Sequence, residues 1–300
     1  MCGIVGYFDR SGEPVQPLGA TVLGMLRALG CRGPDSAGVA LEGLRRPGHW
    51  TFRVKLGERG DEGHGARVAE IAGRFGASGI ETIGPYARFS VPSAADLVSV
   101  TTALEAVSPE VEVVSAGHRL EVSKQVGSPD NLDKTFGISA FEGSHGIGHT
   151  RLSTESKVDL SHSQPFWGHG CPDLAIVHNG HITNYHQLRR RYEQRGVRFY
   201  TENDSEVIAV YLGERLGLGD TLEAAFHAMM RDMDGSFSCM ATTADAIGFI
   251  KDPFAFKPLV FAETRGFVAI ATEEVAIRAA IPGDYDVVEA AVRHVKVWTV

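Results

Sequence analysis

Long apolar runs, a basic excess and paired cysteines are all missing from this 300-residue chain. No stretch has the length and apolar character that crossing a bilayer requires. A charged Asp9–Arg10 pair follows the first apolar run, which argues against a secretory signal. The net charge of −8 at pH 7 disfavours nucleic acid or an anionic membrane as the main partner. We therefore expect a cytoplasmic protein.

The four cysteines are scattered, at Cys2, Cys31, Cys171 and Cys239. They form neither a disulfide framework nor a CxxC metal spacing, so mostly buried thiols in a reducing compartment are the simplest interpretation for the last three. The hydrophobic content of 43% and the charged content of 22% are ordinary for a soluble globular protein. A chain of this length can bury a sizeable core without cross-links.

Cys2 follows the initiator methionine directly, so removal of Met1 would leave its thiol beside a free α-amino group. Such an amine titrates near about 7.7–8.0 and can therefore take up or supply a proton at neutral pH. Nucleophile and general base would then come from one residue, as in threonine nucleophiles that use their own N-terminal amine. From this residue alone, an ordinary buried thiol that happens to be second stays open as the alternative.

The apolar pattern predicts many short strands and a few helices. Helices are expected over residues 18–30, 66–74, 184–194, 205–216, 222–233 and 274–280. Strands are expected over residues 2–9, 146–151, 174–178, 236–243, 246–251, 260–262 and 267–271. Because their order is not a strict strand–helix alternation, we expect an α+β fold with antiparallel sheets packed between helices.

Residues 80–135 are expected to form a separate small unit. Strand-like patterns at residues 86–91, 111–115 and 118–124 enclose a helical pattern at residues 94–107. A β-α-β-β order of this kind suggests a small α+β subdomain inserted into a longer domain. Residues 128–136 are polar and are interpreted as a link back to that domain.

Short motifs in a fixed order follow Cys2. They are Cys2-Gly-Ile-Val-Gly6, Arg32-Gly-Pro-Asp-Ser-Ala-Gly38, Gly148-His-Thr-Arg-Leu-Ser-Thr154, Ser163-Gln-Pro-Phe166, His178-Asn-Gly-His-Ile-Thr-Asn184, Asn203-Asp-Ser-Glu206, Asp234-Gly-Ser-Phe-Ser238, Lys251-Asp-Pro-Phe-Ala-Phe-Lys-Pro-Leu259 and Ala271-Thr-Glu-Glu274. In this order they resemble the class II glutamine amidotransferases, which are N-terminal-nucleophile hydrolases. The resemblance covers residues 2–60 and 146–280. It implies a type-2 amidotransferase domain over residues 1–300, with a four-layer αββα fold around two stacked antiparallel sheets.

The resemblance also implies how this domain would hold glutamine. Cys2 would be the nucleophile and, through its amine, the general base. Arg151 would bind the α-carboxylate, which suits a guanidinium fork, and Thr154 would add a hydroxyl. Asp204 would pair with the α-ammonium group. A helix N-cap just before residue 205 is the alternative role for that carboxylate.

Three further positions take their roles from the same resemblance. The side chain of Asn179 and the N–H of Gly180 would form the oxyanion hole, where each donor typically contributes a few kcal/mol. Arg32 would steady the loop over Cys2.

His145 and His149 lie four apart, but they fall at the entry to a strand rather than on a helix, so no metal site is expected there.

Departures from the family pattern lie beside the substrate arginine. Leu152 stands where the family has tryptophan or tyrosine, Glu155 follows Thr154, and Ser163 stands where asparagine is common. We therefore expect the lid over the substrate to close differently from that of the family.

Class II amidotransferases usually carry a synthase domain that consumes the ammonia, and this chain shows no such domain, so the resemblance implies a synthase-type partner subunit. The stretch 148–156 and the inserted unit are most similar to the stand-alone amidotransferase subunit of glutamate-synthase-like complexes, in particular N-methylglutamate synthase. A flavin and an iron–sulfur cluster are expected in those partners, and no cofactor in this chain.

Two functions stay open at this point. One is a glutaminase that releases glutamate and ammonia and feeds the ammonia to a partner. The other is a catalytically weak subunit that binds glutamine or glutamate for structural or regulatory purposes. The intact set Cys2, Arg151, Asn179, Gly180 and Asp204 favours the first, because a degenerate subunit would be expected to lose the thiol.

Overall fold

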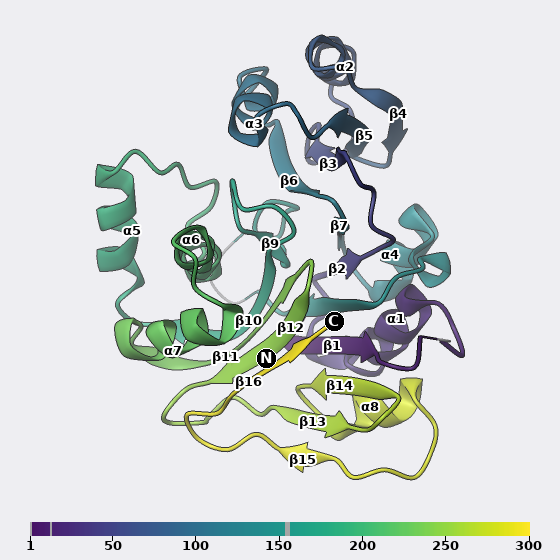
Figure 1. The fold of residues 1–300 in the computed structure, drawn as a ribbon, viewed down its shortest axis with the longest axis vertical. Coiled ribbons are helices and arrows are strands. Elements are labelled where there is room, and N and C mark those ends of the chain that lie inside the picture. The colour runs from purple at the N-terminus through teal and green to yellow at the C-terminus, as the bar shows by residue number, and fades with distance from the viewer. Residues whose placement is uncertain (1, 13, 154–156) are drawn as a thin grey trace.

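A computed structural model describes residues 2–12, 14–153 and 157–300. In this part of the chain the strands form three sheets, with seven, five and four strands, and Figure 1 shows their arrangement. No helix of the described residues combines the length and apolar character of a membrane span.

The seven-stranded sheet holds the first strand of the chain between other strands. Its order is β15-β13-β14-β1-β8-β2-β7, and neighbours pair antiparallel throughout. The strands are β1 (Gly3–Asp9), β2 (Ser36–Glu42), β7 (Leu120–Val126), β8 (His145–Arg151), β13 (Val260–Glu263), β14 (Phe267–Ala271) and β15 (Val288–Glu289). Because β1 lies between β14 and β8, the residue just before it is held at a fixed place.

The five-stranded sheet stacks on the first and supplies the other side of the site. Its order is β16-β12-β11-β10-β9. The strands are β9 (Phe166–Trp167), β10 (Ala175–Ile182), β11 (Gly235–Thr243), β12 (Ala246–Lys251) and β16 (Val295–Thr299). Ile147 of β8, Val177 of β10 and Met240 of β11 belong to one buried cluster, so the two sheets share a core.

Helices cover the outer faces of both sheets (Figure 1). On the seven-stranded sheet lie α1 (Leu18–Ala28), α4 (Pro129–Phe136) and α8 (Glu274–Ala280), with short turns η1 (Gly30–Arg32) and η2 (Ile138–Ala140). On the five-stranded sheet lie α5 (Tyr185–Gln194), α6 (Asp204–Gly217) and α7 (Leu222–Asp232). Each helix buries one apolar face, as α1 does with Val22, Met25 and Leu26. The expected four-layer αββα arrangement is confirmed.

The third sheet forms a small unit whose bounds differ from the expected 80–135 segment. Its order is β4-β5-β3-β6, with β3 (His49–Lys55), β4 (Ser78–Ile83), β5 (Tyr86–Pro92), β6 (Glu112–Gly117), α2 (Gly65–Arg74) and α3 (Leu97–Glu105). The unit therefore begins near residue 49. The expected last strand, β7, leaves it because all seven of its residues pair with β2 in the larger sheet. Residues 129–136, expected as a link, form α4.

This small unit is continuous with the rest of the molecule. Phe52 and Phe89 of its sheet belong to the same buried cluster as Ile147 and Val177 between the larger sheets. The unit and the four-layer body therefore share one core, and a side chain of the third sheet can reach the segments that border the site.

Candidate active site

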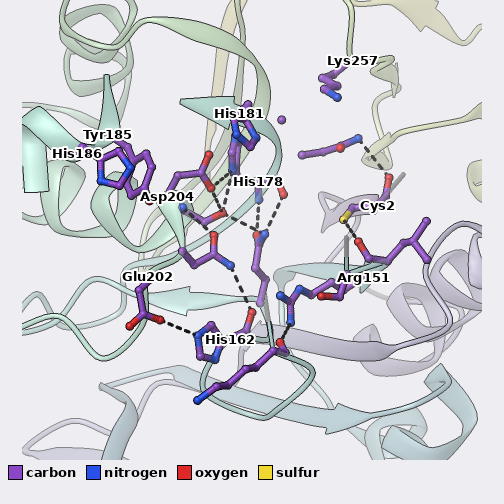
Figure 2. A pocket seen from close by; sticks show the side chains of 18 residues that line it. Cys2, Arg151, His162, His178, His181, Tyr185, His186, Glu202, Asp204 and Lys257 are labelled. Carbon is purple, nitrogen blue, oxygen red and sulfur yellow. Dashed lines mark hydrogen bonds and ion pairs between the residues drawn. The ribbon is translucent and has the colours of Figure 1, made fainter. Parts of the chain in front are cut away.

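One cavity collects residues from both large sheets and from the start of α6 (Figure 2). It measures about 740 Å³ and is lined by Cys2, Arg151, Asn179, Gly180 and Asp204, among others. These residues lie at the start of β1, the end of β8, within β10 and at the first position of α6. The structure thus brings together five of the seven positions that the sequence predicts for the site.

Cys2 is held from two sides. It directly precedes β1, whose Gly3 pairs with Thr150 of the neighbouring strand. The Nδ2 group of Asn179 donates a hydrogen bond to the main-chain oxygen of Cys2 at 3.2 Å. The thiol itself lies 3.9 Å from the carbonyl oxygen of Leu152. The thiol-bearing residue is therefore fixed between the two sheets and is partly exposed to the cavity.

Arg151 is the last residue of β8 and is only 4% exposed. Its Nη1 donates to the main-chain oxygen of Lys157 at 2.8 Å. Burial lowers the pKa of this guanidinium, while the nearby Cys2, Asp159 and Asp35 act in the opposite direction. An arginine stays cationic at neutral pH even so, and the cavity wall therefore carries a fixed positive charge.

Asp204 supplies a negative charge from a different element. It is the first residue of α6, and its Oδ2 accepts the N–H of Ile182 at 2.8 Å. The helix cap, which was the alternative role for this carboxylate, is made by Asn203, whose Oδ1 accepts the N–H of Ser205 at 3.0 Å. Asp204 is therefore not needed as the cap and borders the cavity.

Gly180 follows Asn179 in β10, at a position that requires glycine. Its φ is +153°, which side-chain-bearing residues rarely adopt. A Cβ placed there would also collide with the main-chain oxygen of Ser236 on the paired strand. The backbone of residues 179 and 180 can therefore approach the cavity closely.

The other two predicted positions are Thr154 and Arg32. Thr154 is outside the described residues. Arg32, expected to steady the loop over Cys2, is not among the described residues that line the cavity. It sits in η1 and pairs with Glu273, just ahead of α8. This ion pair ties the loop before β2 to the end of β14.

Several cavity residues carried no predicted role. Gln164 bridges to β10: its Nε2 donates to the main-chain oxygen of His178 at 3.0 Å, and its Oε1 accepts the N–H of His178 at 2.6 Å. His162 contacts Asp159 at 2.7 Å and Glu202 at 3.3 Å. The hydrogen bond to Asp159 is the main cause of its raised pKa. Gln164 and Lys257 fall inside quoted motifs and could have been selected, whereas His162 and Glu202 lie outside the motifs.

Two histidines lie in the interior close to the site. His149 of β8 is fully buried, and burial, together with the charges of Arg151 and His178, lowers its pKa to about 3. His178 of β10 is 2% exposed, and its Nδ1 lies 2.8 Å from the hydroxyl of Ser205. Both are neutral at physiological pH. Among the described residues no group of three or more His, Cys, Asp or Glu is arranged to hold a metal ion.

Known proteins share both the sequence and the fold. Residues 149–279 match the family described as glutamine amidotransferase domain. The glutamine amidotransferase-like protein GlxB of Rhizobium meliloti is 35% identical over 281 residues, which cover 91% of this chain and 89% of that protein. A putative glutamine amidotransferase of Methanothermobacter thermautotrophicus is 34% identical over 286 residues, covering 93% of each.

A solved structure confirms the architecture. The glutamine phosphoribosylpyrophosphate amidotransferase from B. subtilis superposes with a TM-score of 0.62 at 18% identity. The match covers 99% of this chain but 49% of that one. At this identity the likeness concerns the fold.

Proposed function

The chain belongs to the class II glutamine amidotransferases, and from this premise we propose that it hydrolyses L-glutamine through a Cys2 thioester and passes the ammonia to a synthase-type partner. The observation that carries the proposal is the single cavity lined by Cys2, Arg151, Asn179, Gly180 and Asp204. A fixed cation and a fixed anion in one cavity suit a free amino acid, which carries both charges. A peptide amide would leave them unpaired at a cost.

In the proposed reaction, Arg151 binds the α-carboxylate and Asp204 the α-ammonium group, so the side-chain amide is directed to Cys2. The α-amine of Cys2, freed by loss of Met1, takes the thiol proton as the sulfur attacks the amide carbon. The C–N bond then breaks, and the amine returns the proton to the departing ammonia. Water, deprotonated by the same amine, cleaves the thioester to glutamate and restores the thiol.

Asn179 and Gly180 would stabilise the negative oxygen that forms during both additions. An amide nitrogen carries two N–H groups, so the bond from Asn179 to the main-chain oxygen of Cys2 leaves one for the oxyanion. The N–H of Gly180 would be the second donor. Pre-positioned donors of this kind act without reorganisation when charge develops.

The second part of the proposal concerns the partner subunit that would consume the ammonia. Free ammonia becomes protonated in water and diffuses away, so its consumer should bind where the cavity opens. In the B. subtilis amidotransferase the aligned part is 49% of the chain, which is consistent with a nitrogen acceptor outside this domain. We place the acceptor in glutamate-synthase-like subunits of an N-methylglutamate synthase complex.

A glutamine analogue with a diazo-ketone in place of the amide tests the glutaminase half. Mass spectrometry of the labelled protein should show Met1 absent and the adduct on Cys2. The variant Cys2→Ala should lose both the adduct and glutamate production. Cys31→Ala serves as a matched control because Cys31 is an exposed free cysteine outside the cavity. An active protein that retains Met1, or an adduct on Cys31, would contradict the mechanism.

Co-purification from the source tests the partner half. Glutamate release should rise when the co-purified subunits and their acceptor are added. Methylamine should replace glutamine as nitrogen donor if the complex makes N-methylglutamate. A chain that binds glutamine with its partners present but releases no glutamate would instead support the catalytically weak subunit.

A further inference from the structure

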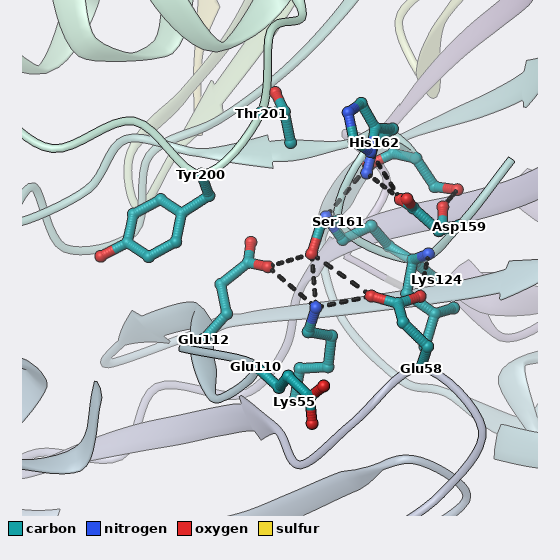
Figure 3. Close-up of polar contacts among 12 residues, drawn as sticks. Lys55, Glu58, Glu110, Glu112, Lys124, Asp159, Ser161, His162, Tyr200 and Thr201 are labelled. Carbon is teal, nitrogen blue, oxygen red and sulfur yellow. Dashed lines mark hydrogen bonds and ion pairs between the residues drawn. The ribbon is translucent and has the colours of Figure 1, made fainter. Parts of the chain in front are cut away.

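A cluster of charges, most of them buried, joins the small unit to the segment that borders the active site (Figure 3). We call residues 157–164 the pocket loop, because Lys157, His162 and Gln164 line the cavity. The cluster consists of Lys55, Glu58, Glu112 and Ser161, with Lys124 nearby. None of these residues has a part in the reaction proposed above.

The small unit supplies the charges. Lys55 on β3 is the cross-strand partner of Glu112 on β6, and both are at least nine-tenths buried. Burial opposes the charge on Lys55, yet Glu112 and Glu58 raise its pKa. Burial likewise opposes the charge on Glu112, yet Lys124 and Lys55 lower its pKa. The pair is therefore ionised in the folded protein.

The pocket loop supplies the groups that these charges hold. The hydroxyl of Ser161 accepts from Lys55 Nζ at 2.5 Å and donates to Glu112 Oε2 at 2.6 Å. The N–H of Leu160 donates to Glu58 Oε2 at 2.8 Å. From β7, Lys124 Nζ donates to the main-chain oxygen of Ser163 at 3.0 Å. These four hydrogen bonds thus fix Leu160, Ser161 and Ser163 of the pocket loop.

The pocket loop also contacts Arg151 itself and the residue before Asp204. We call Arg151 and Asp204, the two charged residues that would hold glutamine, the Arg151–Asp204 clamp. Its first residue, Lys157, accepts a hydrogen bond from Arg151 through its main-chain oxygen. The main-chain oxygen of His162 accepts from Asn203, which caps the helix that begins with Asp204. Its last residue, Gln164, bonds the backbone of His178, beside Asn179. A shift of this loop would therefore move the groups that would hold the substrate.

We propose that Lys55 is a positioning residue for glutamine binding: with Glu112 and Ser161 it sets the pocket loop and thereby the Arg151–Asp204 clamp. The inference rests on the proposed function. Buried ion pairs are a poor source of net stability, whereas a loop without regular secondary structure needs specific contacts to keep one conformation. The four-layer body does not supply the hydrogen bonds that join Leu160 to Glu58 and Ser161 to Lys55 and Glu112, which come from the small unit.

The test compares Lys55→Met with Arg53→Met. Both side chains lie on the same face of β3, two residues apart, and both are buried cations. In each variant the buried carboxylate keeps a second cation: Glu112 keeps Lys124, and Glu121 keeps Arg88. Arg53 bonds Glu121, and no hydrogen bond or ion pair joins it to residues 157–164 in the described part of the chain. Both variants thus remove a similar ion pair, and only Lys55→Met releases the loop.

We expect Lys55→Met to raise the KM for glutamine roughly 10- to 100-fold with little change in kcat, because misplacement of a binding group by about 1 Å can cost about 10²-fold. Arg53→Met should leave KM unchanged at a similar loss of thermal stability. Labelling of Cys2 by the diazo-ketone glutamine analogue should slow by the same factor in Lys55→Met. Labelling of Cys2 by iodoacetamide, which needs no clamp, should not change.

Ser161→Ala keeps the proposal testable should Lys55→Met fail to fold. This variant should also raise the KM for glutamine, by a smaller factor. An unchanged KM in folded Lys55→Met or Ser161→Ala would overturn the proposal, as would an equal KM increase in Arg53→Met. Failure of the diazo-ketone to label Cys2 in the unaltered protein would instead overturn the proposed glutaminase function, and this inference with it.

Discussion

Asn179 shows how one side chain joins the two sheets at the point of chemistry. Its amide bonds the main-chain oxygen of Cys2, and it sits on β10, opposite the strand that positions the thiol. Loss of the amide would remove a donor to the oxyanion and a support of the nucleophile. Both effects act on the reacting atoms, and the Arg151–Asp204 clamp would stay in place.

We therefore expect Asn179→Ala to lower kcat for glutamate release by about 10²–10³, as loss of one oxyanion donor typically does, while KM changes little. Steady-state glutamate release checks this. Asn131→Ala on α4, an exposed position that is not among the described residues lining the cavity, is the matched control. A variant that raises KM and leaves kcat intact would show that Asn179 binds substrate instead.

For single residues, the sequence motifs identified the nucleophile and the charged residues of the site. They did not identify the residues that position these side chains. Cys2, Arg151, Asn179, Gly180 and Asp204 stand in short patterns whose order is informative. His162 and Glu202 reach the cavity from two irregular loops, and no periodicity in the sequence predicts where such loops fold.

Among elements, α6 matters most because its first residue is Asp204. Asn203 caps this helix through Ser205, and Thr221 caps α7 in the same manner through the N–H of Ala224 at 3.2 Å. Both caps satisfy N–H groups that would otherwise lack partners. Only the first cap adjoins the cavity.

Asn203→Ala and Thr221→Ala should each cost about 0.5–2 kcal/mol of unfolding free energy, as loss of a helix cap does. Asn203→Ala should also raise the KM for glutamine, because fraying of the first turn of α6 displaces Asp204. Urea unfolding and steady-state kinetics measure the two effects. Equal KM values in the two variants would mean that the start of α6 does not position the substrate.

The elements that the sequence predicted best are those with clean patterns. The expected bounds of β14 (Phe267–Ala271) and α8 (Glu274–Ala280) match the structure at both ends. No strand was expected at β3, although its apolar residues alternate with polar ones such as Arg53 and Lys55, as in a strand with one apolar face. Both are buried there in ion pairs with Glu121 and Glu112, and the partners lie too far along the chain to be inferred from local sequence.

For the molecule as a whole, the buried histidines couple folding to pH. His149 has a folded-state pKa of about 3, below its unfolded value near 6.5. Below pH 6.5 the unfolded chain therefore binds the extra proton, and stability falls as the pH falls. His162 acts in the opposite direction: its pKa is raised, so its contribution is full below pH 6.5 and is lost as the pH rises through the folded-state pKa.

Between pH 6.5 and 4, the unfolding free energy of the unaltered protein relative to His149→Leu should fall by about 1.4 kcal/mol per pH unit. Relative to His162→Leu, it should instead fall as the pH rises above 6.5. Urea unfolding at a series of pH values measures both slopes. Parallel curves for the protein and His149→Leu would mean that His149 is already protonated in the folded state.

The bounds of the small unit could not be predicted, because its hydrophobic core is continuous with that of the four-layer body. Phe52 and Phe89 share their buried cluster with Ile147 of the seven-stranded sheet. The sequence shows where elements begin and end, but which sheet an edge strand such as β7 joins is decided by pairing over long separations. The αββα body was predictable since its motifs are many and ordered.

The position of β1 has a practical consequence for handling the protein. Its second residue, Ile4, is already fully buried in the middle of a sheet. Only Gly3 lies between this fixed residue and Cys2, so the thiol has little freedom to move. An affinity tag fused to the amino end would turn the α-amine of Cys2 into an amide, which could not take the thiol proton. Immobilisation or labelling should use the opposite end, where Val300 is exposed.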